Sequence, residues 1–351
     1  MARGAARRDP TMEETIADLE PPLPTRMQIE VTAACNLRCR MCLVSYRPSL
    51  GKKEGSLTIE TFRRLVDEND RLEEVTLQGL GEPLLAPDFP LMVEHAARRG
   101  VRMGFNTNGM LLNRARAEPL VRAGLSWIHV SIDGATKATF EGIRHMARFE
   151  TVVQNVQGLV ALKRELDASR PRVQVNFVAM RRNVEELPDL VRLAAGWGVD
   201  RLWVQNLSHS FDDTDPHGAY GDIRQFAESE ALWTGEDRAL ADRIFAKARQ
   251  AAERLGLEVR LPALQPTPVA ARGPDEPGCD WPWRSTYVSH DGKVQPCCMV
   301  MGSDRAELGN VTTQPLVEVW KGEAYREFRA ALLTDRPPPV CRGCSAYRGV
   351  F

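Results

Sequence analysis

Three cysteines lie close together near the N-terminus with the spacing C-x3-C-x2-C. They are Cys35, Cys39 and Cys42, and they follow a strand-like run over residues 27–32. Clustered cysteine thiolates favour iron–sulfur chemistry, and three of them can hold three corners of a [4Fe-4S] cube. The fourth iron then has no protein ligand and can bind another molecule. A zinc site or buried free thiols are the alternatives, but zinc sites normally close with four protein ligands, and no other Cys or His lies within ten residues of the group.

The motif resembles the signature of the radical S-adenosylmethionine (SAM) superfamily, in which it also follows the first strand. The resemblance covers nearly the whole chain from about Thr25. It implies that SAM chelates the open iron through its amino and carboxylate groups, and that an electron from the reduced cluster cleaves SAM to a 5′-deoxyadenosyl radical. Met41 is a minor departure, because the residue before the third cysteine is often aromatic in this family.

A second group of cysteines lies near the C-terminus. Two of them flank a glycine as C-x12-G-x4-C, and two more form a final C-x2-C: Cys279, Gly292, Cys297, Cys341 and Cys344. The glycine belongs to an Asp-Gly pair that predicts a β-hairpin turn, which would bring the first two cysteines together. Four thiolates can hold zinc in an all-cysteine ribbon as well as an iron–sulfur cluster, so the spacing alone leaves both metals open.

Within the superfamily this pattern resembles the shorter, "twitch" version of the SPASM domain. The resemblance implies one auxiliary [4Fe-4S] cluster bound by all four cysteines, as in twitch-bearing aminocyclitol dehydrogenases. Cys298 is left unassigned. It could replace Cys297 as a ligand or give a hydrogen atom to a substrate radical, but we expect it to be inert.

Strand-like and helix-like segments alternate through the first two thirds of the chain. The expected strands are residues 27–32, 74–79, 102–107, 127–132, 173–180 and 201–206. Such alternation predicts βαβ units and a parallel sheet, and residues that could do chemistry follow the C-terminal ends of five of the six strands, as in barrel enzymes. Six strands cannot close an eight-stranded barrel. We therefore predict an α/β fold with a partial (β/α)6 TIM-like barrel, which is also the fold that the resemblance implies.

Two polar segments follow the second and third strands. Gly81-Glu82-Pro83 resembles the family's GGE segment, with Leu80 in place of the first glycine. The resemblance implies that its backbone and Glu82 hold the SAM amino group, although the segment alone would be interpreted as a plain turn. Asn108 could hydrogen-bond to a ribose or a carboxylate, and an Asn-Gly turn is the alternative.

Three further sites are implied by resemblance to the family. Ser131 and Asp133 resemble its S-x-D segment near the SAM ribose and carboxylate, and Arg144 matches an arginine that contacts the SAM carboxylate in related enzymes. Alone, Arg144 would be interpreted as a surface residue. Met180 lies where the adenine wall of the family is found, with packing in the core as an equal alternative.

The composition places few limits on function. The chain has 351 residues, of which 43% are hydrophobic and 26% charged, with a formal net charge of −1. This predicts a globular protein with no indication of a nucleic-acid or membrane partner. Eight cysteines without a hydrophobic signal segment indicate metal ligation in a reducing, cytoplasmic compartment. We expect a flexible arm over 1–24, the barrel over 25–260, a linker over 261–278 and the twitch domain over 279–351.

Other segments carry weaker expectations. Residues 43–56 are expected to form an exposed loop, 315–333 one helix, and the acidic stretch from 208 to 234 a solvated loop or a lid over the substrate. No general base can be assigned, because we expect the candidates His209, His217 and Glu141 to be surface groups.

The leading expectation for function is hydrogen-atom abstraction from a small polar metabolite, such as a sugar or an aminocyclitol. Its oxidation would use the auxiliary cluster as electron acceptor, and a reductase such as flavodoxin or ferredoxin would supply electrons. A peptide-modifying maturase is the alternative among enzymes. A non-catalytic iron–sulfur or zinc protein is the alternative of another class, but it would not need polar residues behind successive strands.

Overall fold

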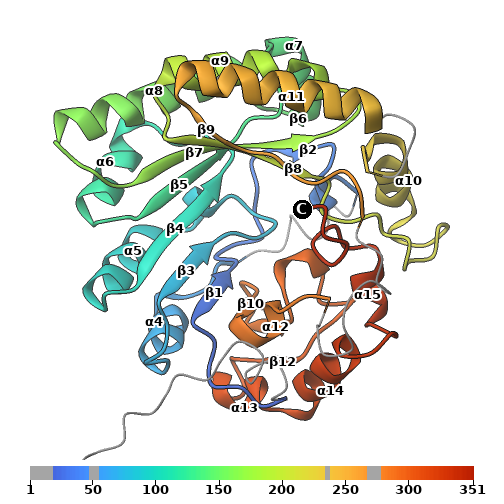
Figure 1. The fold of residues 1–351 in the computed structure, drawn as a ribbon. Helices are drawn as coiled ribbons and strands as arrows, with labels where there is room; N and C mark the ends of the chain where they lie inside the picture. Colours follow the sequence, from blue (N-terminus) through green and yellow to red (C-terminus); the bar gives the residue numbers. More distant parts are fainter. Residues whose placement is uncertain (1–18, 47–54, 234–237, 267–277) are drawn as a thin grey trace, which may run out of the picture.

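One long, open sheet forms the centre of the protein. The computed structural model describes residues 19–46, 55–233, 238–266 and 278–351. Within them the sheet has ten strands in the order β12-β11-β10-β1-β3-β4-β5-β7-β8-β9 (Figure 1). The two end strands, β12 and β9, do not pair with each other. The sheet is therefore a curved, open half-barrel.

The six expected strands are all present and parallel. They are β1 (Arg26–Ile29), β3 (Glu74–Leu77), β4 (Arg102–Thr107), β5 (Trp127–Ser131), β7 (Arg172–Ala179) and β8 (Arg201–Asn206). A further short strand, β9 (Glu258–Arg260), pairs in parallel with β8. Three residues are too few to show a hydrophobic period, so the sequence did not reveal it. The predicted α/β partial barrel is confirmed, with one strand more than expected.

Helices cover the outer face of the half-barrel (Figure 1). They are α4 (Ile59–Asp67), α5 (Phe89–Arg98), α6 (Arg114–Arg122), α7 (Lys137–Ile143), α8 (Phe149–Glu165), α9 (Leu187–Trp197) and α11 (Arg238–Leu255). In α4, Ile59, Phe62, Leu65 and Val66 recur at helical spacing and are buried, while the Thr58 side chain caps the first turn by accepting from the Thr61 N–H. The apolar faces of these helices cover the outer face of the sheet. The inner face of the sheet is therefore left for polar residues.

The C-terminal region extends the same sheet. Strand β10 (Ser285–Val288) pairs in parallel with β1 and antiparallel with β11 (Lys293–Gln295), which pairs with β12 (Gly309–Asn310). The predicted Asp-Gly hairpin is thereby confirmed. The short helices α12 (Trp281–Arg284) and α15 (Pro339–Arg342) carry or flank the cysteines. The C-terminal region is therefore joined to the barrel by backbone hydrogen bonds at β1.

Three expectations about local structure are wrong. The acidic stretch over 208–234, expected as a solvated loop or a lid, contains the helix α10 (Gly221–Glu230). The single helix over 315–333 is divided into α13 (Leu316–Trp320) and α14 (Glu323–Leu332). The break lies at Gly322, where a Cβ would come within 2.9 Å of the Glu318 carbonyl oxygen. The expected loop over 43–56 begins with a short helix, α2 (Leu43–Tyr46), because Leu43 and Val44 are buried; residues 47–54 lie outside the described part.

The first described residues lie against the C-terminal helices. The Trp320 indole N–H donates to the carbonyl oxygens of Pro21 and Pro22, at 3.1 and 3.0 Å. The Arg329 guanidinium donates to the Leu19 carbonyl oxygen at 2.7 Å. Residues 19–24 of the predicted arm thus make specific contacts with α13 and α14. The other boundaries of the predicted arm, barrel, linker and twitch domain stay predictions, and residues 1–18 and 267–277 lie outside the described part.

Candidate active site

The loop that carries the three N-terminal cysteines follows β1 and is held from the other side of the barrel. A two-residue strand, β2 (Arg38–Cys39), pairs antiparallel with β6 (Arg144–His145), so that Cys39 lies opposite Arg144. The Arg144 guanidinium donates to the Cys39 sulfur at 3.8 Å. Strand β6 therefore brings Arg144 from a distant segment to the cysteine loop. The expected contact of Arg144 with the SAM carboxylate stays a prediction.

The three N-terminal thiols are half-buried. Burial raises the pKa of Cys39 to about 11 and that of Cys42 to about 12. Burial also raises the pKa of Cys35. Such groups become thiolates only when metal ligation supplies the compensating positive charge.

Glu82 is buried at the junction of β3, β4 and the cysteine loop. One carboxylate oxygen accepts from the Thr107 hydroxyl at 2.8 Å and the Leu84 N–H at 3.2 Å, and the other accepts from the Asn108 N–H at 2.8 Å. Burial raises the pKa of Glu82, opposed by these hydrogen bonds. The Asn108 side chain in turn donates to Asn36, between two of the cysteines, at 2.8 Å. The structure thus brings Glu82 and Asn108 together beside the cysteine loop.

Gly81 lies too close to the cysteine loop for any side chain. A Cβ there would come within 2.0 Å of the Thr32 carbonyl oxygen and 2.7 Å of the Ala34 carbonyl oxygen. The next residue, Glu82, donates its backbone N–H to the same Ala34 oxygen at 2.8 Å. Backbone atoms cannot yield as a flexible side chain can, so Gly81 sets the distance between the two loops.

We therefore expect Gly81→Ala to lower the iron that the N-terminal site retains after anaerobic reconstitution. Gly158→Ala on α8 is the matched control, since its Cβ meets nothing within 4 Å and a helical alanine is favoured by about 1 kcal/mol. Iron per chain and thermal unfolding check this. Equal iron in both variants would contradict the close approach of the two loops.

Asp133 and Arg144 contact each other directly. Arg144 Nη2 lies 2.6 Å from Asp133 Oδ2, with side-chain exposures of 10% and 0%. The other carboxylate oxygen accepts from the Val178 N–H at 2.8 Å. Burial raises the pKa of Asp133, and the nearby Arg144 opposes that rise. The pair therefore links the ends of β5 and β7 to the cysteine loop.

The remaining two expected SAM contacts differ in position. Ser131 ends β5 and is half-buried. Met180 is fully buried in an apolar cluster that includes Leu43 and Ile143. Its surroundings match the packing alternative, and a role as an adenine wall stays a prediction.

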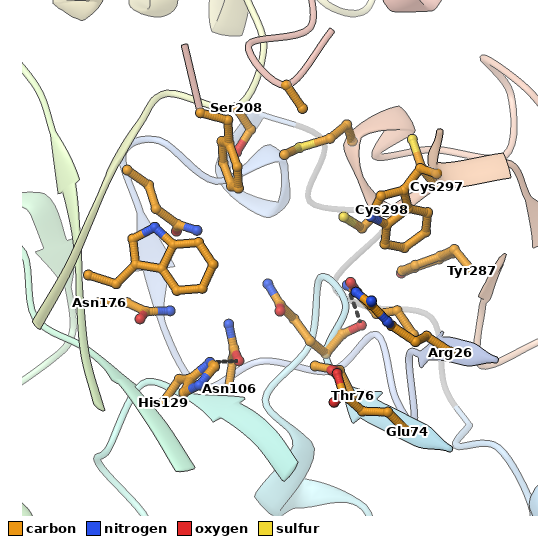
Figure 2. Close-up of a pocket in the computed structure, with 18 of the residues that line it drawn as sticks. Arg26, Glu74, Thr76, Asn106, His129, Asn176, Ser208, Tyr287, Cys297 and Cys298 are labelled. Carbon is orange, nitrogen blue, oxygen red and sulfur yellow. Dashed lines mark hydrogen bonds between the residues drawn. The ribbon is translucent and has the colours of Figure 1, made fainter. Parts of the chain in front are cut away.

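The C-terminal cysteines gather on the inner side of the half-barrel. Figure 2 shows Cys297 and Cys298 across the cavity from the strand residues Asn106, His129 and Asn176. All five C-terminal thiols line this cavity of about 880 Å³: Cys279, Cys297, Cys298, Cys341 and Cys344. Burial raises the pKa of Cys297 well above its usual range, and the charges of the other four thiols add to the rise. The predicted grouping of these cysteines is therefore present, with Cys298 among them.

The inner face of the sheet supplies cavity-lining residues that sequence reasoning missed. Side chains that alternate along β1, β3, β4, β5, β7 and β8 point into the cavity, and many are amides or aromatic: Gln28, Gln78, Asn106, His129, Gln174, Asn176, Trp203 and Gln205. Burial lowers the pKa of His129 to about 3, and its Nδ1 lies 3.0 Å from Asn106 Oδ1. Polar residues at every second strand position were the available signal.

His209 is not a surface group. It is 2% exposed, and its Nε2 lies 2.6 Å from the Val340 carbonyl oxygen between the C-terminal cysteines and the barrel. Burial lowers its pKa to about 4. The nearby Asp213 forms a buried ion pair with Arg305 at 2.8 Å. The start of the acidic segment after β8 thus packs on the C-terminal region, whereas His217 is exposed as expected and Glu141 is half-buried.

Comparison with known proteins agrees with this geometry. A model of the radical SAM superfamily matches residues 29–194, and a model of the SPASM iron–sulfur cluster-binding domain matches residues 279–345. No helix of the described part is long and apolar enough to cross a membrane.

Relatives of known function align over most of the chain. The chain is 25% identical to the tungsten-containing aldehyde ferredoxin oxidoreductase cofactor-modifying protein of Pyrococcus furiosus, over 91% of this chain and 86% of that protein. It is 26% identical to the PqqA peptide cyclase of Xanthomonas campestris pv. campestris, over 92% of this chain and 80% of that protein.

A solved structure matches the fold. SuiB of Streptococcus suis, bound to its precursor peptide SuiA, gives a TM-score of 0.68 at 14% identity, over 94% of this chain and 71% of that chain. The cysteine loop lies beside Glu82, the fold is a half-barrel, and two domain models match the chain. The chain therefore belongs to the radical SAM enzymes with a C-terminal SPASM-like iron–sulfur domain, and its cofactors are SAM on a [4Fe-4S] cluster and an auxiliary iron–sulfur cluster.

Proposed function

We propose that this radical SAM enzyme modifies a peptide. The observation that carries the proposal is the cavity between the half-barrel and the C-terminal cysteines, whose wall is rich in Gln and Asn side chains. Amide side chains can both donate to and accept from a peptide backbone. The PqqA peptide cyclase, which aligns over 92% of this chain, supports the same substrate class.

We assign the metal ligands by the two groups of thiols. Cys35, Cys39 and Cys42 would hold the cluster that binds SAM, and Cys279, Cys297, Cys341 and Cys344 the auxiliary cluster. When bound, these groups supply a radical that removes a hydrogen atom from the substrate, and an acceptor for one further electron. A reductase such as flavodoxin or ferredoxin would deliver the first electron.

The chain's own residues would bind SAM and hold the substrate. Gly81 leaves room for the close approach of the two loops, and Glu82, fixed by three donors, would accept from the SAM amino group. Asn108 and Ser131 would hydrogen-bond to its polar edge. Arg144, kept in place by Asp133, would bind its carboxylate.

A small polar metabolite is the second candidate. It was the leading expectation from the sequence. The relative from Pyrococcus furiosus is named a cofactor-modifying protein, which supports a non-peptide substrate. The amide-lined cavity suits a sugar or an aminocyclitol chemically, but the aligned relatives support a peptide better. The two candidates differ in what stimulates SAM cleavage.

The test is a substrate screen scored by release of 5′-deoxyadenosine. The reconstituted, reduced protein is incubated with SAM and either short peptides encoded beside its gene or a panel of sugars and aminocyclitols. We expect a peptide to stimulate release and to change in mass, which mass spectrometry detects. Stimulation by a sugar or an aminocyclitol alone would overturn the proposal.

A further inference from the structure

The cavity wall is strongly basic where the strands begin. Parallel strands start at the same edge of a sheet, and several of these begin with arginine, as Arg26 does in β1 (Figure 2). Among the described residues, the cavity is lined by six arginines but by a single Asp or Glu side chain, that of Glu74. The six are Arg26, Arg102, Arg170, Arg172, Arg201 and Arg260. We call this group the arginine edge.

Too few carboxylates are present to neutralise the arginine edge. Glu74 lies in register between Arg26 and Arg102 and contacts the second of them at 3.0 Å. Glu258 on β9 forms ion pairs with two arginines, at 3.0 Å from Arg172 and 3.5 Å from Arg201.

Three arginines of the edge have no such partner. Among the described residues, no Asp or Glu lies within ion-pair distance of Arg26, Arg170 or Arg260, and all three are exposed. His129 adds no positive charge near neutral pH, because burial lowers its pKa to about 3. The edge therefore carries a net positive charge that faces an open cavity.

The surroundings of the arginine edge favour a peptide over a nucleic acid. Trp203 could stack on a base, but Arg260 lies over its ring, 4.2 Å from the centroid. Deeper in the cavity the wall consists of Gln and Asn side chains, such as Gln28 and Gln78, which match a peptide backbone. The whole chain has a net charge of −1, so the positive charge is local rather than general.

We propose that the substrate peptide carries clustered Asp or Glu residues that bind the arginine edge. Arginine recognises carboxylates through paired, charge-assisted hydrogen bonds. When these acidic residues are bound there, the neighbouring segment of the peptide lies along the Gln and Asn side chains of the cavity wall, toward the C-terminal cysteines. This inference rests on the proposed peptide function and specifies the substrate within that class.

The test measures binding directly, so that it does not depend on turnover. The reconstituted full-length protein is titrated against fluorescein-labelled peptides of one scaffold that carry clustered Glu, Gln or Lys, and anisotropy is recorded. We expect the Glu peptide to bind most tightly, and less tightly as salt rises from about 0.05 to 0.5 M. Exposed ion pairs contribute about 0.2–1 kcal/mol each, so the double variant Arg170→Gln/Arg260→Gln should weaken its binding by about two- to thirtyfold.

Arg249→Gln is the matched control, because this exposed arginine lies on α11 outside the cavity; it should leave binding unchanged. Equal binding of the Glu and Gln peptides would overturn the acidic class but leave a peptide substrate standing. No binding of any peptide would count against both proposals. Tighter binding of an RNA oligonucleotide that the double variant abolishes would assign the arginine edge to a nucleic acid instead.

Discussion

Cys39→Ala should abolish SAM cleavage and remove one of the two clusters. Three thiols hold the N-terminal cube, and the buried loop has no spare Cys or His to replace one of them. We expect the iron content to fall from about eight to about four per chain. Formation of 5′-deoxyadenosine should fall by more than about a thousandfold, because enzymes typically supply at least a 10⁶-fold acceleration.

Cys298→Ala is the control for this experiment. Cys298 lines the cavity beside Cys297, and we expect it to be inert, so its loss should leave iron and SAM cleavage at the wild-type level. Iron and sulfide analysis with chromatography of 5′-deoxyadenosine measures both variants. Full iron in Cys39→Ala would show that this thiol is not a ligand. Loss of iron in Cys298→Ala would move it into the auxiliary ligand set in place of Cys297.

Arg144→Met should destabilise the protein even before any cluster is added. The guanidinium faces Asp133 at 2.6 Å, and both side chains are buried. Removing one partner of a buried ion pair leaves an uncompensated charge and typically costs about 3–5 kcal/mol. The double variant Asp133→Asn/Arg144→Met should regain much of this loss, because an asparagine oxygen can still accept from the Val178 N–H. Urea unfolding of the metal-free, reduced protein measures the free energies.

The loss should depend on pH with a definite sign. Burial raises the pKa of Asp133 above its value in the unfolded chain, and without Arg144 only the hydrogen bond from the Val178 N–H still favours the charged form. A group with a raised pKa stabilises the folded state below its unfolded pKa, and this stability is lost as the pH rises through the folded value. The Arg144→Met variant should therefore be less stable at pH 8 than at pH 5, relative to the wild type.

Arg122→Met is the control, since its ion pair with Glu118 is on the surface and its loss should cost less than about 1 kcal/mol. A double variant no more stable than Arg144→Met would contradict the account of this pair.

Features that depend on local spacing could be predicted from the sequence. The three N-terminal cysteines, the helices with one apolar face and the Asp-Gly hairpin are set by residues close together in the chain. The grouping of Glu82 with Asn108 was also predictable, because both follow neighbouring parallel strands. Their contact through the Asn108 N–H, at 2.8 Å, is a consequence of that adjacency.

Features that depend on contacts between distant segments could not be predicted. The pairing of β10 with β1 and of β2 with β6 leaves no local pattern in the sequence. The burial of His209 arises only because the C-terminal region lies on it. The Gln and Asn side chains of the cavity wall and the arginine edge also need the curvature of the open sheet, since each strand contributes at most three of these side chains.

In the proposed site, one iron of the N-terminal cluster is left free for SAM. Electron paramagnetic resonance of the reduced, anaerobically prepared protein, with and without SAM, reports on this iron. We expect signals from two clusters, of which SAM shifts one, and loss of that SAM-sensitive signal in Cys39→Ala. Zinc in place of iron at the N-terminal site, or a cluster signal that SAM leaves unchanged, would contradict this expectation.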